Sequence, residues 1–337
     1  MKAFFMLGPG SAEIAQVPSP VRKPGEALLQ VRYVGLCGSD LNSYRGRNPL
    51  VSYPRIPGHE ISATVVEIDE SHNGFAVGSS VTLSPYTNCG VCASCRNNRS
   101  NACEFNQTLG VQRDGALTEY ISVPVRKLYR ANLSQKELSL VEPLTVGCHA
   151  VARARVAPTD TVAIFGCGGV GLGAVAASAF RGATTIAIDI DDAKLDIATK
   201  AGALHVINSR QQNPAPAIKE LTGGFGPQVV IEAVGYPETF RAAVDIVAFT
   251  GRVVYIGYAK EPVTYETRFF VQKELDIMGA RNALPRDFEE VISMLEQGRF
   301  PVDSVISAVV PLEEAPAILA AWDTDPQRYT KILISVG

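Results

Sequence analysis

Four cysteines, Cys89, Cys92, Cys95 and Cys103, lie within fifteen residues that read C-G-V-C-A-S-C-R-N-N-R-S-N-A-C. The first three recur at every third position, and the fourth follows after seven intervening residues. Four thiolates on one short lobe of chain can converge on a tetrahedral zinc ion. The alternatives are an incidental cluster or a disulfide pair, for which C-x-x-C spacing is geometrically poor. Because all four ligands are cysteine and none leaves a position for substrate, we expect a structural zinc and place the chemistry elsewhere.

A second set of potential ligands is spread along the chain. Cys37 lies in G-L-C-G-S-D, His59 lies in P-G-H-E, and Glu142 opens the segment E-P-L. A thiolate, an imidazole and a carboxylate are the donors of a catalytic zinc whose fourth position stays open. Spacing alone does not assemble them, because Cys37 and Glu142 are about a hundred residues apart. On chemistry alone, a histidine beside a glutamate is more often a core or surface residue.

Residues 166–171 read G-C-G-G-V-G, a G-x-G-x-x-G pattern. The pattern follows the apolar run Val162–Phe165 and opens a helical stretch at Val170, where amide donors can meet a pyrophosphate. Asp189 ends the next strand-like run, twenty-three residues after the first glycine, where an acid would bind the ribose hydroxyls and repel a 2′-phosphate. The nearest following cation is Lys194. We therefore expect NAD rather than NADP, with a flavin-binding or cofactor-free Rossmann fold as the alternative.

Two kinds of element must position these groups. The first 140 or so residues hold short strand-like runs broken by glycine and proline, which predicts a loop-rich antiparallel domain. These runs are Ala27–Val34, Ile61–Ile68, Ser80–Leu83 and Leu117–Val123. After Glu142, strands alternate with helices, which predicts a parallel sheet with crossover helices. The expected strands are Thr161–Phe165, Thr185–Ile188, Val229–Glu232, Gly251–Ile256 and Leu275–Met278, and the expected helices are Leu144–Ala154, Val170–Ala179, Ala193–Lys200, Thr239–Val247 and Asp287–Gln297. A closing strand at Lys331–Val336 could return to the first domain.

Length and composition narrow the class of protein. A chain of 337 residues is long enough for two domains. Its net charge of −3 argues against a nucleic-acid partner. The uncharged segment Thr161–Phe180 has about the length of a membrane span, but its order of β-branched, glycine and alanine residues predicts strand, turn and helix instead. The three cysteines outside the lobe, Cys37, Cys148 and Cys167, indicate a reducing compartment, so we expect a cytoplasmic protein without a membrane span. His72 is expected in an exposed turn.

Taken together, the motifs resemble a known family. The segments around Cys37 and His59, the cysteine lobe, Asp114-Gly115 before Glu119-Tyr120, E-P-L and the glycine loop occur in order along the whole chain. The sequence resembles the zinc-containing medium-chain alcohol dehydrogenases, in their polyol and threonine dehydrogenase branch. R-G-R-N-P at 45–49, Y-P-R at 53–55 and A-R-N-A at 280–283 resemble bacterial sugar-acid and sugar-alcohol oxidoreductases of the L-galactonate dehydrogenase type. The resemblance implies an α/β fold, with a GroES-like, β-rich catalytic domain over 1–145 and 280–337 and a doubly wound Rossmann domain over 146–279.

The resemblance also implies roles for individual residues. Cys37 and His59 would bind the catalytic zinc. In this branch the third ligand is the glutamate after the histidine, here Glu60, while the glutamate of E-P-L, here Glu142, lies close and acts through water or exchanges onto the metal. Sequence does not rank the two, so both stay candidates. Ser39 would take the proton of the substrate alcohol. Where the family has a histidine three residues later, this chain has Asn42, whose amide does not titrate near pH 7, so the proton must leave by another route. The cofactor contacts that we expect are Gly166, Gly168, Gly169, Val170, Gly171, Asp189, Lys194, Ala233 and Gly257.

The expected function is NAD-dependent oxidation of a secondary alcohol in a polyol or sugar acid to a ketone, with two zinc ions per chain. A threonine-type amino-alcohol dehydrogenase and a non-catalytic scaffold that binds zinc and NAD are the alternatives. Arg45, Arg47 and Arg113 could meet a substrate carboxylate, although unpartnered surface arginines are more common. The resemblance further implies a homodimer or homotetramer.

Overall fold

The structure is a computed structural model that describes residues 1–69 and 74–337, so His72 lies outside the described residues. The chain forms two compact units, Met1–Glu142 with Val305–Gly337, and Pro143–Ser304. Residues 280–304, which we expected in the first domain, belong to the second unit. The reason is helix α9 (Pro285–Glu296), whose Asp287 Oδ2 lies 2.8 Å from His149 Nδ1. Both of these residues are buried and both belong to the second unit.

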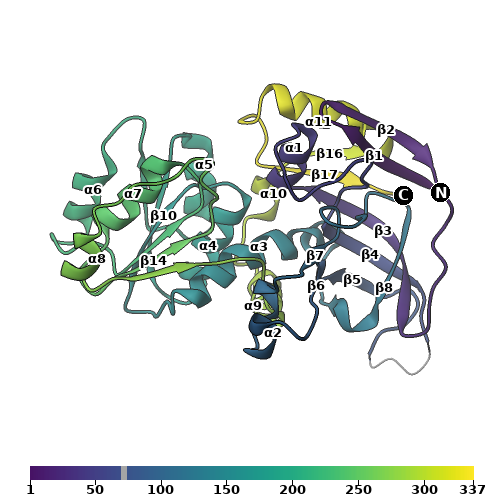
Figure 1. The fold of residues 1–337 in the computed structure, drawn as a ribbon, viewed down its shortest axis with the longest axis horizontal. Coiled ribbons are helices and arrows are strands. Elements are labelled where there is room, and N and C mark those ends of the chain that lie inside the picture. The colour runs from purple at the N-terminus through teal and green to yellow at the C-terminus, as the bar shows by residue number, and fades with distance from the viewer. Residues whose placement is uncertain (70–73) are drawn as a thin grey trace. The chain divides into compact units, whose positions relative to one another are not determined.

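The first unit is built on a mainly antiparallel sheet in the order β16-β17-β3-β4-β5-β9, with β8 also paired to β3 (Figure 1). The strands are β3 (Glu26–Leu36), β4 (Glu60–Glu67), β5 (Ser80–Leu83), β8 (Tyr120–Pro124), β9 (Leu128–Arg130), β16 (Ile306–Pro311) and β17 (Lys331–Ser335). The predicted antiparallel domain is confirmed. The last strand does return to it, because β17 pairs with β3.

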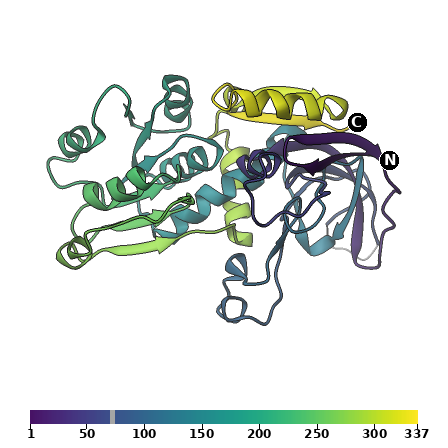
Figure 2. The same cartoon turned by 45° about the horizontal axis from the view of Figure 1, so that its top comes forward.

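A β-hairpin and a helix complete this unit. The hairpin of β1 (Lys2–Gly8) and β2 (Ser11–Gln16) lies beside helix α11 (Ala315–Thr324), drawn in yellow in Figure 2. Alternate residues of β3, including Leu29 and Val31, are fully buried in the apolar core of the unit. This alternation is the signature of a strand with one face on the core.

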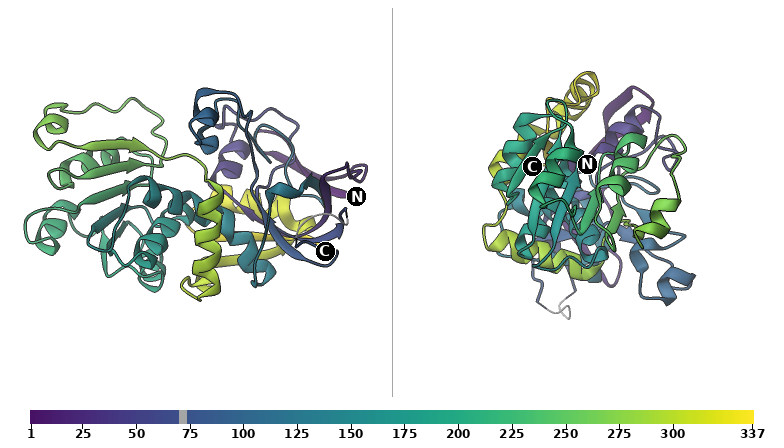
Figure 3. Two further views of the ribbon diagram at one scale, coloured as in Figure 1. Left: turned by 90° about the horizontal axis from the view of Figure 1, so that it is seen from below. Right: turned by 90° about the vertical axis from the view of Figure 1, so that its left-hand side faces the viewer.

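The second unit has a six-stranded parallel sheet in the order β12-β11-β10-β13-β14-β15, with helices on both faces (Figure 3). Its strands are β10 (Thr161–Phe165), β11 (Thr184–Asp189), β12 (His205–Asn208), β13 (Val229–Glu232), β14 (Arg252–Tyr255) and β15 (Asp276–Gly279). Its helices include α4 (Gly169–Phe180), α5 (Asp192–Lys200), α6 (Pro214–Leu221), α7 (Pro237–Ile246) and α8 (Arg268–Gln272). The predicted strand–helix alternation is confirmed. Among the helices that the structure describes, none is both long and apolar enough to cross a membrane.

Helix α3 (Gln135–Arg153) starts nine residues before the helix that we predicted from Leu144. Proline lacks the amide donor that a helix interior needs, so it is uncommon inside a helix. The structure instead places Pro143 inside the helix. Glu142 is therefore held on a helix rather than on a loop.

Candidate metal and cofactor sites

The structure brings Cys37, His59 and Glu60 together through one pair of strands. Cys37 directly follows β3, His59 directly precedes β4, and the two strands pair so that Gly35 lies opposite Glu60. Glycine is required at position 35, since a β-carbon there would lie 2.0 Å from Glu60 Oε2. One potential ligand atom from each of Cys37, His59 and Glu60 lies within 4.8 Å of the others. The strand register therefore assembles three donors that sequence spacing could not.

A second close approach fixes the backbone before His59. Gly58 has a φ of 104°, and Gly110 and Gly115 pack directly against it. A β-carbon on Gly115 would lie 2.4 Å from the carbonyl oxygen of Gly58. The Asp114-Gly115 motif thus contributes to the position of His59, because only glycine allows the two chain segments to touch.

Glu60 is paired with a buried cation. Lys331 Nζ lies 2.8 and 2.7 Å from the two carboxylate oxygens of Glu60 and donates to the carbonyl of Leu36 at 3.2 Å. Burial alone would lower the pKa of Lys331, but the negative charges of Glu60 and Cys37 raise it above the ordinary lysine value. Lys331 therefore holds a permanent positive charge beside the candidate ligands.

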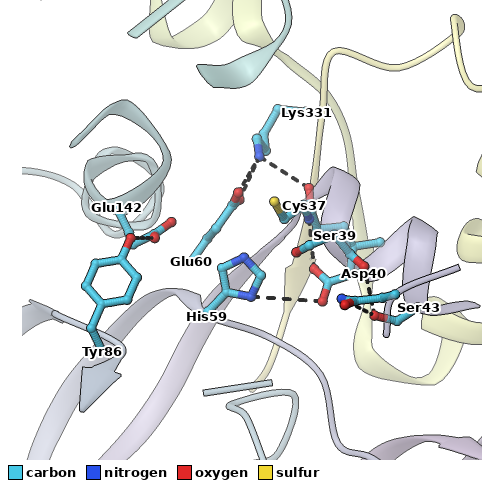
Figure 4. A network of polar contacts seen from close by, with 11 residues as sticks. Cys37, Ser39, Asp40, Ser43, His59, Glu60, Tyr86, Glu142 and Lys331 are labelled. Atoms are coloured by element: carbon cyan, nitrogen blue, oxygen red, sulfur yellow. Dashed lines mark hydrogen bonds and ion pairs between the residues drawn. The ribbon is translucent and has the colours of Figure 1, made fainter. Parts of the chain in front are cut away.

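Glu142 lies outside this set of three and has a different partner. The buried Tyr86 hydroxyl donates a hydrogen bond to Glu142 Oε1. In Figure 4 the Glu142 carboxylate points toward Tyr86, whereas the Glu60 carboxylate points toward Lys331. Burial raises the pKa of Glu142 to about 7, while His59 opposes this rise. Of our two candidates for the third ligand, the geometry favours Glu60.

The remaining polar groups fit a bound metal ion. The Asp40 carboxylate accepts a hydrogen bond from the Cys37 amide at 2.8 Å and lies 4.0 Å from His59 Nδ1, which favours a cationic or metal-bound imidazole. Within the described part of the chain, the buried Ser39 Oγ and His59 Nδ1 have no hydrogen-bond partner. A buried polar atom without a partner is costly unless a ligand satisfies it. Thiolate, imidazole and carboxylate donors with a nearby free hydroxyl match a catalytic zinc site.

The cysteine lobe offers a second site. The four Sγ atoms of Cys89, Cys92, Cys95 and Cys103 all lie within 4.8 Å of one another. Cys103 Sγ is 3.6 Å from Cys89 Sγ and 3.8 Å from Cys92 Sγ, far longer than the roughly 2.05 Å of a disulfide bond. The Cys89 and Cys92 amides donate to sulfur atoms of this cluster. A hydrogen bond from Ser94 lowers the pKa of Cys92 to about 5, which favours the thiolate that binds zinc, whereas burial raises the pKa of Cys103 to about 11.

The glycine loop has the geometry of a dinucleotide site. Gly166 has a φ of 91°, and a β-carbon on Gly171 would lie 1.8 Å from the Gly166 carbonyl oxygen. Gly168 is the N-cap of α4, and the loop that contains Ala233 packs against Gly166. The loop therefore lies at the carboxyl ends of β10 and β13, where doubly wound sheets bind nucleotides.

The expected ribose ligand lies at the same sheet edge. Asp189 ends β11, and its carboxylate accepts hydrogen bonds from the Cys167 and Ile190 amides, each at 2.7 Å. Gly257 follows β14 and lies against Glu232, since a β-carbon on it would be 2.4 Å from Glu232 Oε2. Lys194 is carried by α5, the helix that follows Asp189. The structure thus places Asp189 and Gly257 at the carboxyl ends of two strands of one sheet, and Lys194 on the helix that follows β11.

We predicted no role for Asp40, Tyr86 or Lys331 from the sequence. Asp40 belongs to the same G-L-C-G-S-D segment as Cys37, so the sequence did indicate that it lies close to the site. Lys331 begins an otherwise apolar terminal strand, where a lone lysine is a weak signal. Nothing in the sequence around Tyr86 indicated a contact with Glu142. Arg45, which we considered for substrate binding, is bound instead to Asp323, with Nε 2.5 Å from Oδ1.

Comparison with known proteins gives a consistent result. Residues 23–132 match the alcohol dehydrogenase GroES-like domain, and residues 169–297 match the zinc-binding dehydrogenase domain. The chain is 36% identical to sorbitol dehydrogenase of Bacillus subtilis, covering 87% of this chain and 86% of the relative. It is 32% identical to L-galactonate-5-dehydrogenase of Escherichia coli K12, with the same coverage of 87% and 86%. The NADH complex of the alcohol dehydrogenase RspB from Escherichia coli CFT073 superposes with a TM-score of 0.91 at 27% identity, over 99% of both chains.

Proposed function

This chain belongs to the zinc-type alcohol dehydrogenase family, and from that premise we propose that it oxidises a secondary alcohol of a polyol or sugar acid to a ketone, with NAD⁺ as the hydride acceptor. The observation that carries the proposal is the set of Cys37, His59 and Glu60, whose ligand atoms lie within 4.8 Å of one another and of which His59 and Glu60 are buried. These three residues would hold the catalytic zinc. The cysteine lobe would hold a second, structural zinc.

Each residue near the site would have a limited task. A bound zinc ion would supply Lewis acidity that stabilises the alkoxide of the substrate. Ser39 offers a buried hydroxyl without a protein partner, which suits it to accept the alcohol proton. Asp40 would orient His59, and Lys331 would offset the charge of Glu60. Because Asn42 replaces the usual histidine of the family, the proton would pass from Ser39 to water or to the cofactor ribose.

The second unit would hold the cofactor. The amides of residues 166–171 would bind the pyrophosphate, and Asp189 would bind the adenosine ribose. We propose NAD rather than NADP, since the carboxylate of Asp189 would lie where the 2′-phosphate carries its negative charge.

The substrate class follows from the relatives, sorbitol dehydrogenase and L-galactonate-5-dehydrogenase. We propose a cytoplasmic location, since all seven cysteines are free thiols in the described structure, as a reducing compartment allows.

A screen of NAD⁺ reduction against sugar acids, polyols, L-threonine and simple alcohols tests the activity, with Cys37→Ala as the control. Turnover of a sugar acid or polyol that is lost in the control is the expected result. Turnover of L-threonine alone would replace the proposed substrate class by an amino alcohol. A protein that binds zinc and NAD but oxidises nothing would support the non-catalytic scaffold instead.

We also propose that the chain forms a dimer through the outer edge of the parallel sheet. Among the residues that the structure describes, strand β15 has no neighbour on one side, and Ile277 on it is 39% exposed. Unpaired apolar edge strands are templates for pairing with another chain. Light scattering should give a dimer or tetramer for the wild type and a smaller species for Ile277→Lys. Val206→Lys is the matched control, because Val206 is 41% exposed on β12, at the opposite edge of the same sheet.

A further inference from the structure

Two buried carboxylates lie near the same candidate metal site. Glu60 is 1% exposed and Glu142 is 4% exposed. A catalytic zinc with an open position takes three protein ligands, and Cys37 and His59 already supply two. A second carboxylate on the metal would occupy the position that the substrate hydroxyl needs. The fold must therefore keep one of these carboxylates away from the metal.

Each carboxylate has its own fixed partner. Glu60 is held by Lys331 through both of its oxygens, while Glu142 receives the hydrogen bond of the Tyr86 hydroxyl. The Tyr86 backbone is itself restrained. Strand β6 (Tyr86–Thr87) pairs with β7 (Gln107–Thr108), and Lys127 Nζ donates to the Tyr86 carbonyl at 2.5 Å. A buried tyrosine on a restrained backbone can hold a carboxylate in one orientation.

The two orientations have different consequences for the metal. An oxygen of Glu60 lies within 4.8 Å of both the Cys37 and the His59 ligand atoms, whereas among the described residues Glu142 joins no such group. Zinc–carboxylate bonds are about 2.0–2.2 Å long, so the ligand atoms of one ion must converge closely. In the orientation that the Tyr86 hydrogen bond holds, no Glu142 oxygen joins the Cys37 and His59 ligand atoms within 4.8 Å.

We propose that Tyr86 is a positioning residue that holds Glu142 off the catalytic metal and thereby makes Glu60 the third protein ligand. Tyr86 acts through Glu142 and touches neither the metal nor the substrate. The proposal rests on the proposed zinc site, but it does not depend on the identity of the substrate.

Cobalt substitution tests this directly. The visible bands of protein-bound Co²⁺ report its coordination number, and they require neither cofactor nor substrate. Cobalt-loaded wild type would be compared with Tyr86→Phe, Glu142→Gln and the double variant. The cysteine lobe should bind cobalt equally in all four proteins, because none of the substitutions lies in it, so its bands should cancel in difference spectra.

Each variant has its own expected cobalt spectrum. Glu142→Gln should match the wild type, because Glu142 is not a ligand when Tyr86 is present. Tyr86→Phe should lose intensity in the ligand-field bands as Glu142 adds to the coordination shell, and the double variant should return to the wild-type spectrum. The Tyr86→Phe variant could instead lose cobalt from the proposed site. Recovery of cobalt binding in the double variant, which lacks the Glu142 carboxylate, would also support the proposal.

Three outcomes would overturn the proposal. One is a Tyr86→Phe spectrum identical to the wild type, and another is a Glu142→Gln spectrum that differs from it. The third is a change in Tyr86→Phe that persists in the double variant, which would assign Tyr86 to packing alone. If the wild type binds cobalt only in the cysteine lobe, the proposed catalytic site is refuted together with the role of Tyr86. If the protein is inactive but gives the expected spectra, the proposed activity is refuted and the role of Tyr86 stands.

Discussion

The ion pair between Lys331 and Glu60 should dominate the stability of the metal-free first unit. Lys331 is 5% exposed and Glu60 1%, and their two contacts measure 2.8 and 2.7 Å. The substitution Lys331→Met keeps most of the side-chain length but removes the charge. It leaves Glu60 as a buried carboxylate without its cationic partner.

The size of the effect follows from the burial of both groups. Breaking a buried ion pair by removing one partner costs about 3–5 kcal/mol. In a unit of this size, each kcal/mol lowers the melting temperature by roughly 2–4 °C, so the expected fall is about 6–20 °C. Zinc bound to Glu60 would supply a replacement charge, and the fall should be clearly smaller when the metal is present.

Thermal unfolding with and without zinc measures both effects. Lys136→Met is the matched control, since Lys136 is exposed on α3 in the same unit and its loss should change stability by less than about 0.5 kcal/mol. The reasoning is refuted if Lys331→Met melts like the control without metal. It is also refuted if zinc leaves the difference between Lys331→Met and the wild type unchanged.

Three further predictions concern other parts of the molecule. Gly115→Ala places a methyl group 2.4 Å from the carbonyl oxygen of Gly58, directly before the ligand histidine. Bound zinc, measured by metal analysis, should therefore fall from two ions toward one per chain. The control Gly8→Ala, whose methyl group meets no atom within 4 Å, should keep both ions. Asp189→Ser should raise the ratio of kcat/KM for NADP⁺ over NAD⁺ about tenfold or more, and an unchanged ratio would remove Asp189 from cofactor selection. Because burial raises the pKa of Glu142 from 4.5 to about 7, its contribution to metal-free stability is complete below pH 4.5 and is lost as the pH rises through about 7. Glu142→Gln should flatten the melting-temperature profile over that range, and a profile that keeps its slope would contradict the assignment.

Local patterns predicted the second unit well. The apolar run at Thr161–Phe165, the glycines after it and the alanine-rich stretch that follows are contiguous, and they form β10, the loop and α4 as expected. The four-cysteine lobe is likewise a local feature, and its Sγ atoms do converge. In both cases the residues that must meet are neighbours in the sequence.

The contacts that tune the metal site were not predictable in the same way. Lys331 reaches Glu60 only because β17 pairs with β3, which in turn pairs with β4. Tyr86 meets Glu142, which is carried by the first half of α3, a stretch that we did not predict as helix. These contacts depend on long-range strand pairing and on side-chain direction, and neither leaves a pattern in a single sequence. Residues 280–304 were assigned to the first domain for the same reason, since their contacts with His149 and α4 join segments far apart along the chain.

The most direct test of the central claim is the metal dependence of hydride transfer. It would use a substrate identified in the screen and deuterated at the carbinol carbon, and it would follow transfer of the label to NAD⁺ by mass spectrometry. We predict transfer by the zinc-loaded protein, none after zinc is removed from the Cys37 site, recovery when zinc is restored, and none in Cys37→Ser. Label transfer that survives both removal of the metal and Cys37→Ser would contradict the claim that Cys37, His59 and Glu60 form a catalytic zinc site.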